Sequence, residues 1–150
     1  MHAVEAARKP PATIPADRTI TEAAEEMDRL AVGALMVVDE GDRLVGIVTD
    51  RDLVVRGLAR RTDPQARVDS VMTTDLMVLP ADADLRDALP IFETHALRRL
   101  PLVDGDRLVG MLTMDDLVVD LTADLARLTR PITAQVLFGH REPSTPAALS

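Results

Sequence analysis

GDRLVG occurs twice in this 150-residue chain, at Gly41–Gly46 and again at Gly105–Gly110. The residues after each copy, GIVTDRDL and GMLTMDDL, share the frame G-x-x-T-x-x-D-L. Upstream, at a spacing of 65 residues, Thr13–Glu40 aligns with Val78–Gly105, and one extra residue near Glu40 shortens the spacing to 64 afterwards. The chain is therefore predicted to be a tandem duplication.

Each copy predicts the same elements. A short apolar segment ends at a proline, and a capping residue, Thr19 or Asp84, then precedes a helix. Two apolar runs around Asp-Glu-Gly-Asp or Asp-Gly-Asp indicate a hairpin, and a second helix starts at Thr49 or Thr113. This order is β-α-β-β-α, which makes the fold class α/β (α+β). Because one unit is too small to cover its own sheet, we expect the two to pack as a pseudo-two-fold pair around a shared core.

The boundaries that we expect follow from the duplication. The first repeat covers residues 1–66 and the second covers 67–130, with the polar, proline-containing segment Arg60–Val68 as connector. The apolar residues of the last helix continue until Pro131 stops it. Residues 131–150 are expected to form a C-terminal extension, with one short element and a loose tail.

Composition excludes several classes of function. No apolar run approaches the roughly 18 residues that a membrane span needs, and no leader sequence is seen, so we expect a soluble, cytoplasmic protein. The chain has no cysteine and only three histidines, and neither His95 nor His140 has a second nitrogen ligand suitably spaced for a metal. A net charge of −8 and two aromatic residues argue against nucleic-acid binding.

Thr49 and Asp52, with Thr113 and Asp116 in the second copy, stand at predicted strand-to-helix junctions. T-x-x-D before an apolar run is typical of a capping box, in which both side chains bond the amides of the helix itself. The same carboxylate could accept both hydroxyls of a ribose, and the first-turn amides favour phosphate. The two roles are compatible, and the sequence leaves both open.

The duplicated pattern, with GALMVVDEGDRLVGIVTDRDL and RRLPLVDGDRLVGMLTMDDL as its core, resembles the CBS domain, which normally occurs in pairs as a Bateman module. The resemblance spans roughly residues 3–130. It implies a regulatory module that binds AMP, ADP, ATP, S-adenosylmethionine or a cyclic dinucleotide between the repeats, and it implies a homodimer. Carried over by motif, Thr49, Asp52, Thr113 and Asp116 would contact ribose and phosphate.

Other residues join the candidate site with an alternative beside each. Gly46 and Gly110 interrupt apolar strands, which indicates a bulge, a close approach of backbone, or an opening for the ligand. Arg98 and Arg99 face Gly33 and Ala34 in the alignment and would either bind a phosphate or pair with nearby acids. With no Trp or Tyr, adenine would lie between aliphatic side chains such as Ile14 and Leu79.

Two differences between the copies predict unequal clefts. Asp50-Arg51 in the first frame becomes Met114-Asp115 in the second, so the clefts should differ in charge and affinity. Pro90 falls inside the second copy's first helix, where it would kink the helix or move its start.

The leading hypothesis is a non-catalytic sensor that transmits a ligand-induced change to an unidentified protein partner and needs no cofactor or metal. The alternative is a dimerisation or interaction module with vestigial clefts. The sequence shows no nucleophile-base pair and no phosphate-binding glycine loop, so we do not expect an enzyme.

Overall fold

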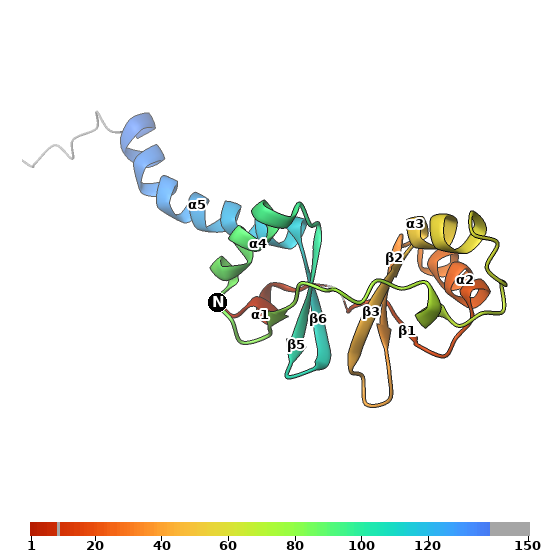
Figure 1. Ribbon diagram of the computed structural model, residues 1–150. Coiled ribbons are helices and arrows are strands. Elements are labelled where there is room, and N and C mark those ends of the chain that lie inside the picture. The colour runs from red at the N-terminus through yellow and green to blue at the C-terminus, as the bar shows by residue number, and fades with distance from the viewer. Residues whose placement is uncertain (9, 139–150) are drawn as a thin grey trace, which may run out of the picture.

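The computed structural model describes residues 1–8 and 10–138, and the surroundings of side chains as far as Pro131 (Figure 1). Its elements form two halves with the same order. The first half consists of β1 (Thr13–Pro15), α2 (Ile20–Leu30), β2 (Ala34–Val38), β3 (Leu44–Thr49), and α3 (Asp50–Asp52) with its π-helical continuation η1 (Leu53–Leu58). The second half consists of β4 (Leu79–Pro80), η3 (Leu85–Asp87), α4 (Ala88–His95), β5 (Arg99–Asp104), β6 (Arg107–Thr113) and α5 (Met114–Phe138). The predicted β-α-β-β-α repeat is confirmed.

Each half contains one three-stranded sheet, in the orders β1-β2-β3 and β4-β5-β6. The first strand of each sheet runs parallel to the middle strand, and the third runs antiparallel to it. Parallel neighbours need a crossover connection, which α2 and α4 supply. The middle strands are the most buried, in keeping with their continuous apolar runs.

A β-bulge lies beside the repeated glycine in both hairpins. The pairing of β2 with β3 skips Val45, next to Gly46. The pairing of β5 with β6 skips Val109, next to Gly110. The bulge that glycine predicted inside these strands is therefore confirmed at both positions.

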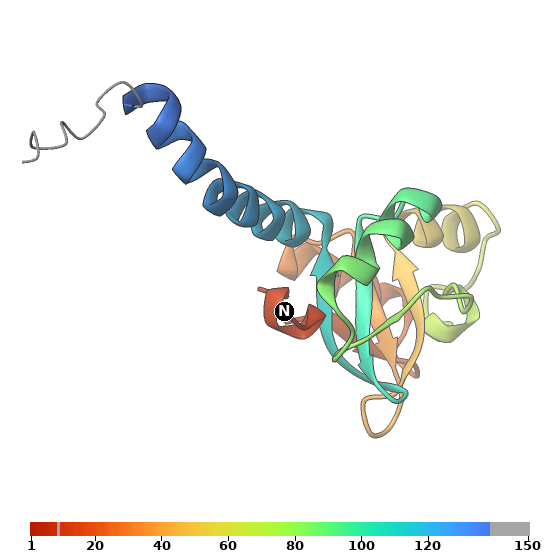
Figure 2. The ribbon, with the colours of Figure 1, turned by 90° about the vertical axis from the view of Figure 1, so that its left-hand side faces the viewer.

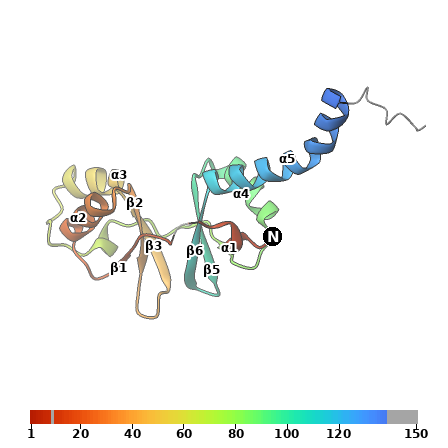
Figure 3. The ribbon, with the colours of Figure 1, turned by 180° about the vertical axis from the view of Figure 1, so that it is seen from behind.

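The two hairpins lie side by side and point the same way (Figures 1 and 3). The Leu44 amide donates to the carbonyl of Asp106 at 3.0 Å, and the Leu108 amide donates to the carbonyl of Asp42 at 2.9 Å. These two bonds exchange under the duplication, which is the expected pseudo-two-fold relation. A buried cluster joins the sheets at this place and consists of Met36, Val38, Leu108 and Met111.

A short helix at the start of the chain, α1 (Ala3–Ala6), packs on the second half. The Ala3 amide donates to the carbonyl of Ala83 at 2.9 Å. Ala3 and Ala6 are buried with Phe92 and Leu100 in the second half's core. Residues that precede the first half's strands in the chain thus complete the core of the second half.

The segment that corresponds to α1 in the second copy packs in the opposite sense, on the first half. The 3-10 turn η2 (Val68–Ser70) comes after the first half's helices, and both Val68 and Val71 are buried in the first half's core. Thr73 then pairs with Ile47 of β3, with N–O distances of 2.9 and 2.8 Å. The segment that leaves the first half is therefore 74–78, later in the chain than the expected connector.

Helix starts follow the capping residues that the sequence indicated. Thr19 accepts a hydrogen bond from the Glu22 amide, and Asp84 accepts one from the Arg86 amide at 2.9 Å, which lowers the pKa of the Asp84 carboxyl. In the second half, 3-10 helix η3 comes first and α4 begins only at Ala88, so that Pro90 is its third residue. The first amides of a helix have no intrahelical partner, so proline is tolerated there. Of the two predicted effects of Pro90, the later start is the one observed.

The expectation that Pro131 ends the last helix is wrong. Helix α5 runs through Pro131 to Phe138 and projects away from both halves (Figure 2). A proline ring inside a helix removes one hydrogen bond and crowds the carbonyl four residues earlier, but an exposed helix can bend around it. The predicted loose tail begins outside the described residues. Across residues 1–8 and 10–138, no helix has both the length and the apolar character needed to cross a membrane.

Candidate functional site: a pocket between the two halves

The T-x-x-D frames form capping boxes in both halves. The Thr49 amide donates to the Asp52 carboxylate at 3.0 Å, and the Asp52 amide donates to Thr49 Oγ1 at 3.1 Å. Thr113 and Asp116 make the same two bonds with the same lengths. One carboxylate oxygen of each aspartate is thus occupied by its own helix, and the predicted capping role is confirmed.

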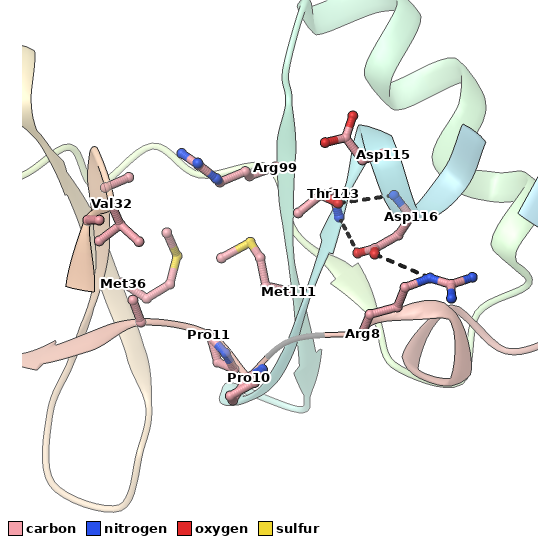
Figure 4. Close-up of a pocket in the computed structure, with 13 residues that line it drawn as sticks. Arg8, Pro10, Pro11, Val32, Met36, Arg99, Met111, Thr113, Asp115 and Asp116 are labelled. Atoms are coloured by element: carbon pink, nitrogen blue, oxygen red, sulfur yellow. Dashed lines mark hydrogen bonds and ion pairs between the residues drawn. The ribbon is translucent and has the colours of Figure 1, made fainter. Parts of the chain in front are cut away.

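The second capping box opens onto a pocket of about 370 Å³ between the two halves (Figure 4). Its floor is made by Met36 of β2 and Met111 of β6, which lie opposite each other across the boundary. The remaining lining residues are Arg8, Pro10, Pro11, Ala12, Ala31, Val32, Ala34, Arg99, Thr113, Asp115 and Asp116. The walls are mainly apolar, with two arginines and two aspartates at the side of α5.

Asp116 is the one buried charged residue in the described part of the chain, at 7% exposure. Its free oxygen, Oδ1, lies 3.7 Å from Nε of Arg8, and the same guanidinium reaches Asp120 at 3.3 Å. Asp120 keeps a second buried oxygen, Oδ2, without a hydrogen-bond partner. One half-exposed arginine therefore neutralises two carboxylates incompletely, and the ion pair with Asp116 is long enough to exchange for another partner.

Of the predicted arginines, Arg99 lines this pocket from the start of β5. Arg98 does not line it but borders a smaller adjoining hollow of about 200 Å³, together with Arg99, Thr113 and Asp115. Neither arginine forms an ion pair among the described residues, so both guanidinium groups are free to meet an anion.

Other predicted site residues lie elsewhere. Ile14 and Leu79 are buried in the separate cores of the two halves, and neither lines the pocket. Gly110 packs against Leu102 and Ala7, and Gly46 lies under the passing segment at Met72 and Thr73. The close approach of backbone that we predicted is therefore confirmed at Gly46. The assignment of Ile14, Leu79, Gly46 and Gly110 as ligand contacts stays a prediction.

Thr49 and Asp52 are not part of this pocket's wall. In the first half, Arg56 from the next turn of the same helix lies 3.9 Å from Asp52 and donates to the carbonyls of Val71 and Met72. The position equivalent to Arg56 is Asp120 in the second half, where the arginine comes from the N-terminal segment instead. The two frames thus differ in which element supplies the arginine, and the predicted difference in charge between the clefts stays a prediction.

Sequence reasoning missed Arg8, Pro10 and Pro11, which form one wall of the pocket. A signal for Arg8 was present, because its equivalent under the 65-residue spacing is Thr73, a neutral residue. No pattern indicated that the segment would cross to the other half. Met111 belongs to the buried cluster between the sheets and also faces the pocket.

Comparison with known proteins agrees with this architecture. The model of the CBS domain matches residues 3–58 and again 68–122. The CBS domain-containing protein YhcV of Bacillus subtilis is 41% identical over 109 residues, which cover 73% of this chain and 77% of that protein.

Two solved structures share the fold. Hypoxic Response Protein I, determined with two coordinated zinc ions, is 32% identical with a TM-score of 0.70, covering 79% of this chain and 97% of that one. In this chain, no group of three His, Cys, Asp or Glu among the described residues could hold a metal. The CBS domain pair of MJ0100, in complex with methylthioadenosine and S-adenosyl-L-methionine, is 25% identical with a TM-score of 0.68, covering 83% and 98% of the two chains. This chain belongs to the CBS domain family, and its two halves are a tandem pair of CBS domains.

Proposed function

We propose that this CBS pair is a non-catalytic regulatory module that binds an adenosine nucleotide in the pocket between its halves. The observation that carries the proposal is the convergence of Asp116, Arg8 and Arg99 on a pocket with mainly apolar walls. A nucleotide has the matching parts, namely a flat base, a diol and an anionic group.

The diol is assigned to Asp116. Two vicinal hydroxyls donate best to a carboxylate, and Oδ1 is the oxygen that the capping box leaves free. Binding would exchange the long contact with Arg8 for two short hydrogen bonds. Arg8 would keep Asp120 as a partner and could also turn toward phosphate.

The phosphate is assigned to Arg99 and the base to the apolar wall. Arg99 lies across the pocket from Pro10 and Pro11 (Figure 4), and its guanidinium can meet phosphate oxygens in a bidentate way. Met36 and Met111 offer polarisable, adaptable surfaces against a ring. The adenosine ligands bound to the MJ0100 pair support this class of ligand.

A second candidate function is an interaction module without a ligand. It is favoured by the engagement of both T-x-x-D aspartates within the chain, Asp52 with Thr49 and Arg56, and Asp116 with Thr113 and Arg8. In that case the frames serve the helices alone. ATP turnover above a buffer blank would contradict both candidates.

The test is thermal unfolding of ligand-stripped protein with millimolar AMP, ADP, ATP, S-adenosylmethionine or a cyclic dinucleotide. At one hundred times its dissociation constant, a ligand adds about 2.7 kcal/mol of stability, which amounts to several degrees. A selective upward shift supports the sensor. No shift with any of the five leaves the interaction module.

Variants then locate the site by calorimetric titration. Asp116→Ala should weaken binding at least tenfold, because the diol loses its acceptor, and Arg99→Gln should weaken AMP more than adenosine. Asp104→Ala, exposed and outside the pocket lining, is the matched control. Asp52→Ala measures any contribution of the first frame. Unchanged affinity in Asp116→Ala would rule out the assigned pocket.

A further inference from the structure

The carboxylate of Asp120 on α5 is incompletely hydrogen-bonded. Its side chain is 15% exposed, and Oδ2 is the one buried side-chain nitrogen or oxygen without a hydrogen-bond partner among the residues whose surroundings the structure describes. The other oxygen, Oδ1, accepts a long bond of 3.3 Å from Nη2 of Arg8. A buried carboxylate oxygen without a donor is energetically unfavourable, so its presence needs a physical reason.

The guanidinium of Arg8 is shared between two carboxylates of α5. Nε lies 3.7 Å from Oδ1 of Asp116 (Figure 4), and Nη2 lies 3.3 Å from Oδ1 of Asp120. Neither contact is the paired arrangement of two N–H groups on two oxygens, in which a guanidinium binds a carboxylate most strongly. Asp116 and Asp120 are four residues apart on one helix, so they lie on one face, and Arg8 can reach either from a single backbone position.

The arginine beside the first frame is fixed in a different way. Nη1 of Arg56 donates to the carbonyls of Met72 and Val71 at 3.0 and 3.3 Å. Its contact with Asp52 is longer, at 3.9 Å. Backbone carbonyls therefore hold this arginine whatever happens at Asp52. In the second half both acceptors of the arginine are carboxylates, and one of them is the aspartate of the frame.

We infer that Asp120 is a positioning residue, which takes Arg8 away from Asp116 when a ligand binds. In the structure Arg8 bridges the two carboxylates. When the diol of a ligand takes Oδ1 of Asp116, Arg8 moves fully onto Asp120, and two of its N–H groups meet Oδ1 and Oδ2. The move supplies the donor that Oδ2 lacks. This inference rests on the proposed function, and it gives a part in binding to Asp120, a residue outside the pocket lining.

Asp120 also determines the direction in which Arg8 moves. If Arg8 turned wholly to a phosphate, Asp120 would remain as a mostly buried carboxylate without a cation. Removing one partner of a buried ion pair is strongly destabilising, so the pair with Asp120 is the one that persists. Phosphate is then left to Arg99. Arg8 acts as a competitor of the diol for Asp116, and Asp120 sets the strength of that competition.

A double-mutant cycle with adenosine, which has the diol but no phosphate, tests this role. Asp120→Asn should weaken adenosine binding about tenfold in calorimetry, because Arg8 then stays on Asp116 and competes with the diol. Arg8→Gln should tighten binding by about twofold to fivefold. Adding Asp120→Asn to Arg8→Gln should change the affinity by less than about twofold, because the competitor is already gone.

The matched control is Asp124→Asn, an exposed aspartate one turn further along α5, which should leave adenosine affinity unchanged with or without Arg8→Gln. A structural role for Asp120 alone would weaken binding equally in the presence and absence of Arg8. Equal weakening in both backgrounds, or no weakening in either, would refute the inference.

A second measurement needs no ligand and separates this inference from the proposed function. Asp116→Asn keeps an acceptor for the Thr113 amide and removes the charge that Arg8 shares. In NMR spectra of nitrogen-labelled protein, a guanidinium held by two bonds rotates slowly and gives resolved Nη signals. Such signals from Arg8, identified by their loss in Arg8→Gln, should appear in Asp116→Asn and disappear in Asp116→Asn/Asp120→Asn.

The two measurements fail in different ways. If the signals appear in Asp116→Asn while the wild-type protein binds neither adenosine nor AMP, the proposed function is wrong and the transfer of Arg8 to Asp120 stands. If adenosine binds and the signals do not appear, the transfer is wrong and the proposed function stands.

Discussion

At the scale of single residues, Gly46 and Gly110 are equivalent in the sequence but differ in the atoms that pack against them. A Cβ at Gly46 would lie 2.5 Å from Sδ of Met72 and 2.9 Å from the carbonyl oxygen of Thr73. A Cβ at Gly110 would meet a Leu102 methyl at 3.3 Å and nothing closer. The segment at Thr73 is fixed by its hydrogen bonds to Ile47, so it cannot move aside easily.

We therefore predict that Gly46→Ala lowers the free energy of unfolding by about 1–3 kcal/mol, the usual effect of overpacking against fixed backbone. Gly110→Ala should change it by less than about 1 kcal/mol, because a leucine methyl can shift and alanine gains strand propensity over glycine. Urea denaturation of both variants measures the difference. Equal losses at the two positions would show that the passing segment is not fixed.

At the scale of elements, two prolines lie in helices with different consequences. Pro90 is the third residue of α4, where its missing N–H has no helical partner to lose. Pro131 lies deep inside α5, where the missing N–H would otherwise bond a carbonyl four residues back. A helix can thus contain proline at its start without cost and in its interior at a cost of about 3 kcal/mol.

Pro131→Ala should consequently increase helicity, seen as stronger ellipticity at 222 nm and slower amide exchange in residues 127–138. Pro90→Ala is the matched control and should leave both signals nearly unchanged. If exchange in α5 were no slower in Pro131→Ala, the proline would not be what weakens the helix at this position.

At the scale of the whole molecule, the two CBS domains are completed by each other's leading segments. Helix α1 supplies Ala3 and Ala6 to the second half, and the η2 segment supplies Val68 and Val71 to the first. These segments, together with the hydrogen bonds between the hairpins, join the two halves. Removing one of these segments should therefore destabilise the half on which it packs, although that half is more distant in sequence.

Deleting residues 1–8 should speed amide exchange in β5 and β6 of the second half, while β2 and β3 of the first half change little. Val68→Ala is the reciprocal variant: it should cost about 2 kcal/mol and act mainly on the first half. Hydrogen exchange followed by mass spectrometry distinguishes the halves. If the deletion sped exchange in the first half instead, α1 would not act by packing on the second half.

Features that depend on neighbours in sequence were predictable. The capping boxes join residues three apart, the hairpin turns join residues a few apart, and the duplication itself predicted that two such units would pack together. The candidate site was predicted in part for the same reason. Thr113 and Asp116 form a local motif, and Arg99 was noticed because its counterpart in the first copy is not charged. Arg8 reaches the site from more than one hundred residues away, and no local pattern records that distance.

The sequence by itself determined the duplicated β-α-β-β-α order, the capped helix starts and the bulged hairpins, because each rests on backbone geometry and hydrogen bonds over a few residues. Only the tertiary structure decided that α1 packs on the second half and η2 on the first, that Arg8 lies beside Asp116, and that Ile14 and Leu79 lie in the cores. It also decided that α5 passes Pro131. The physical reason is that packing between distant segments selects among arrangements that are locally equivalent, and burial and charge neutralisation at the boundary between the halves favour the one observed.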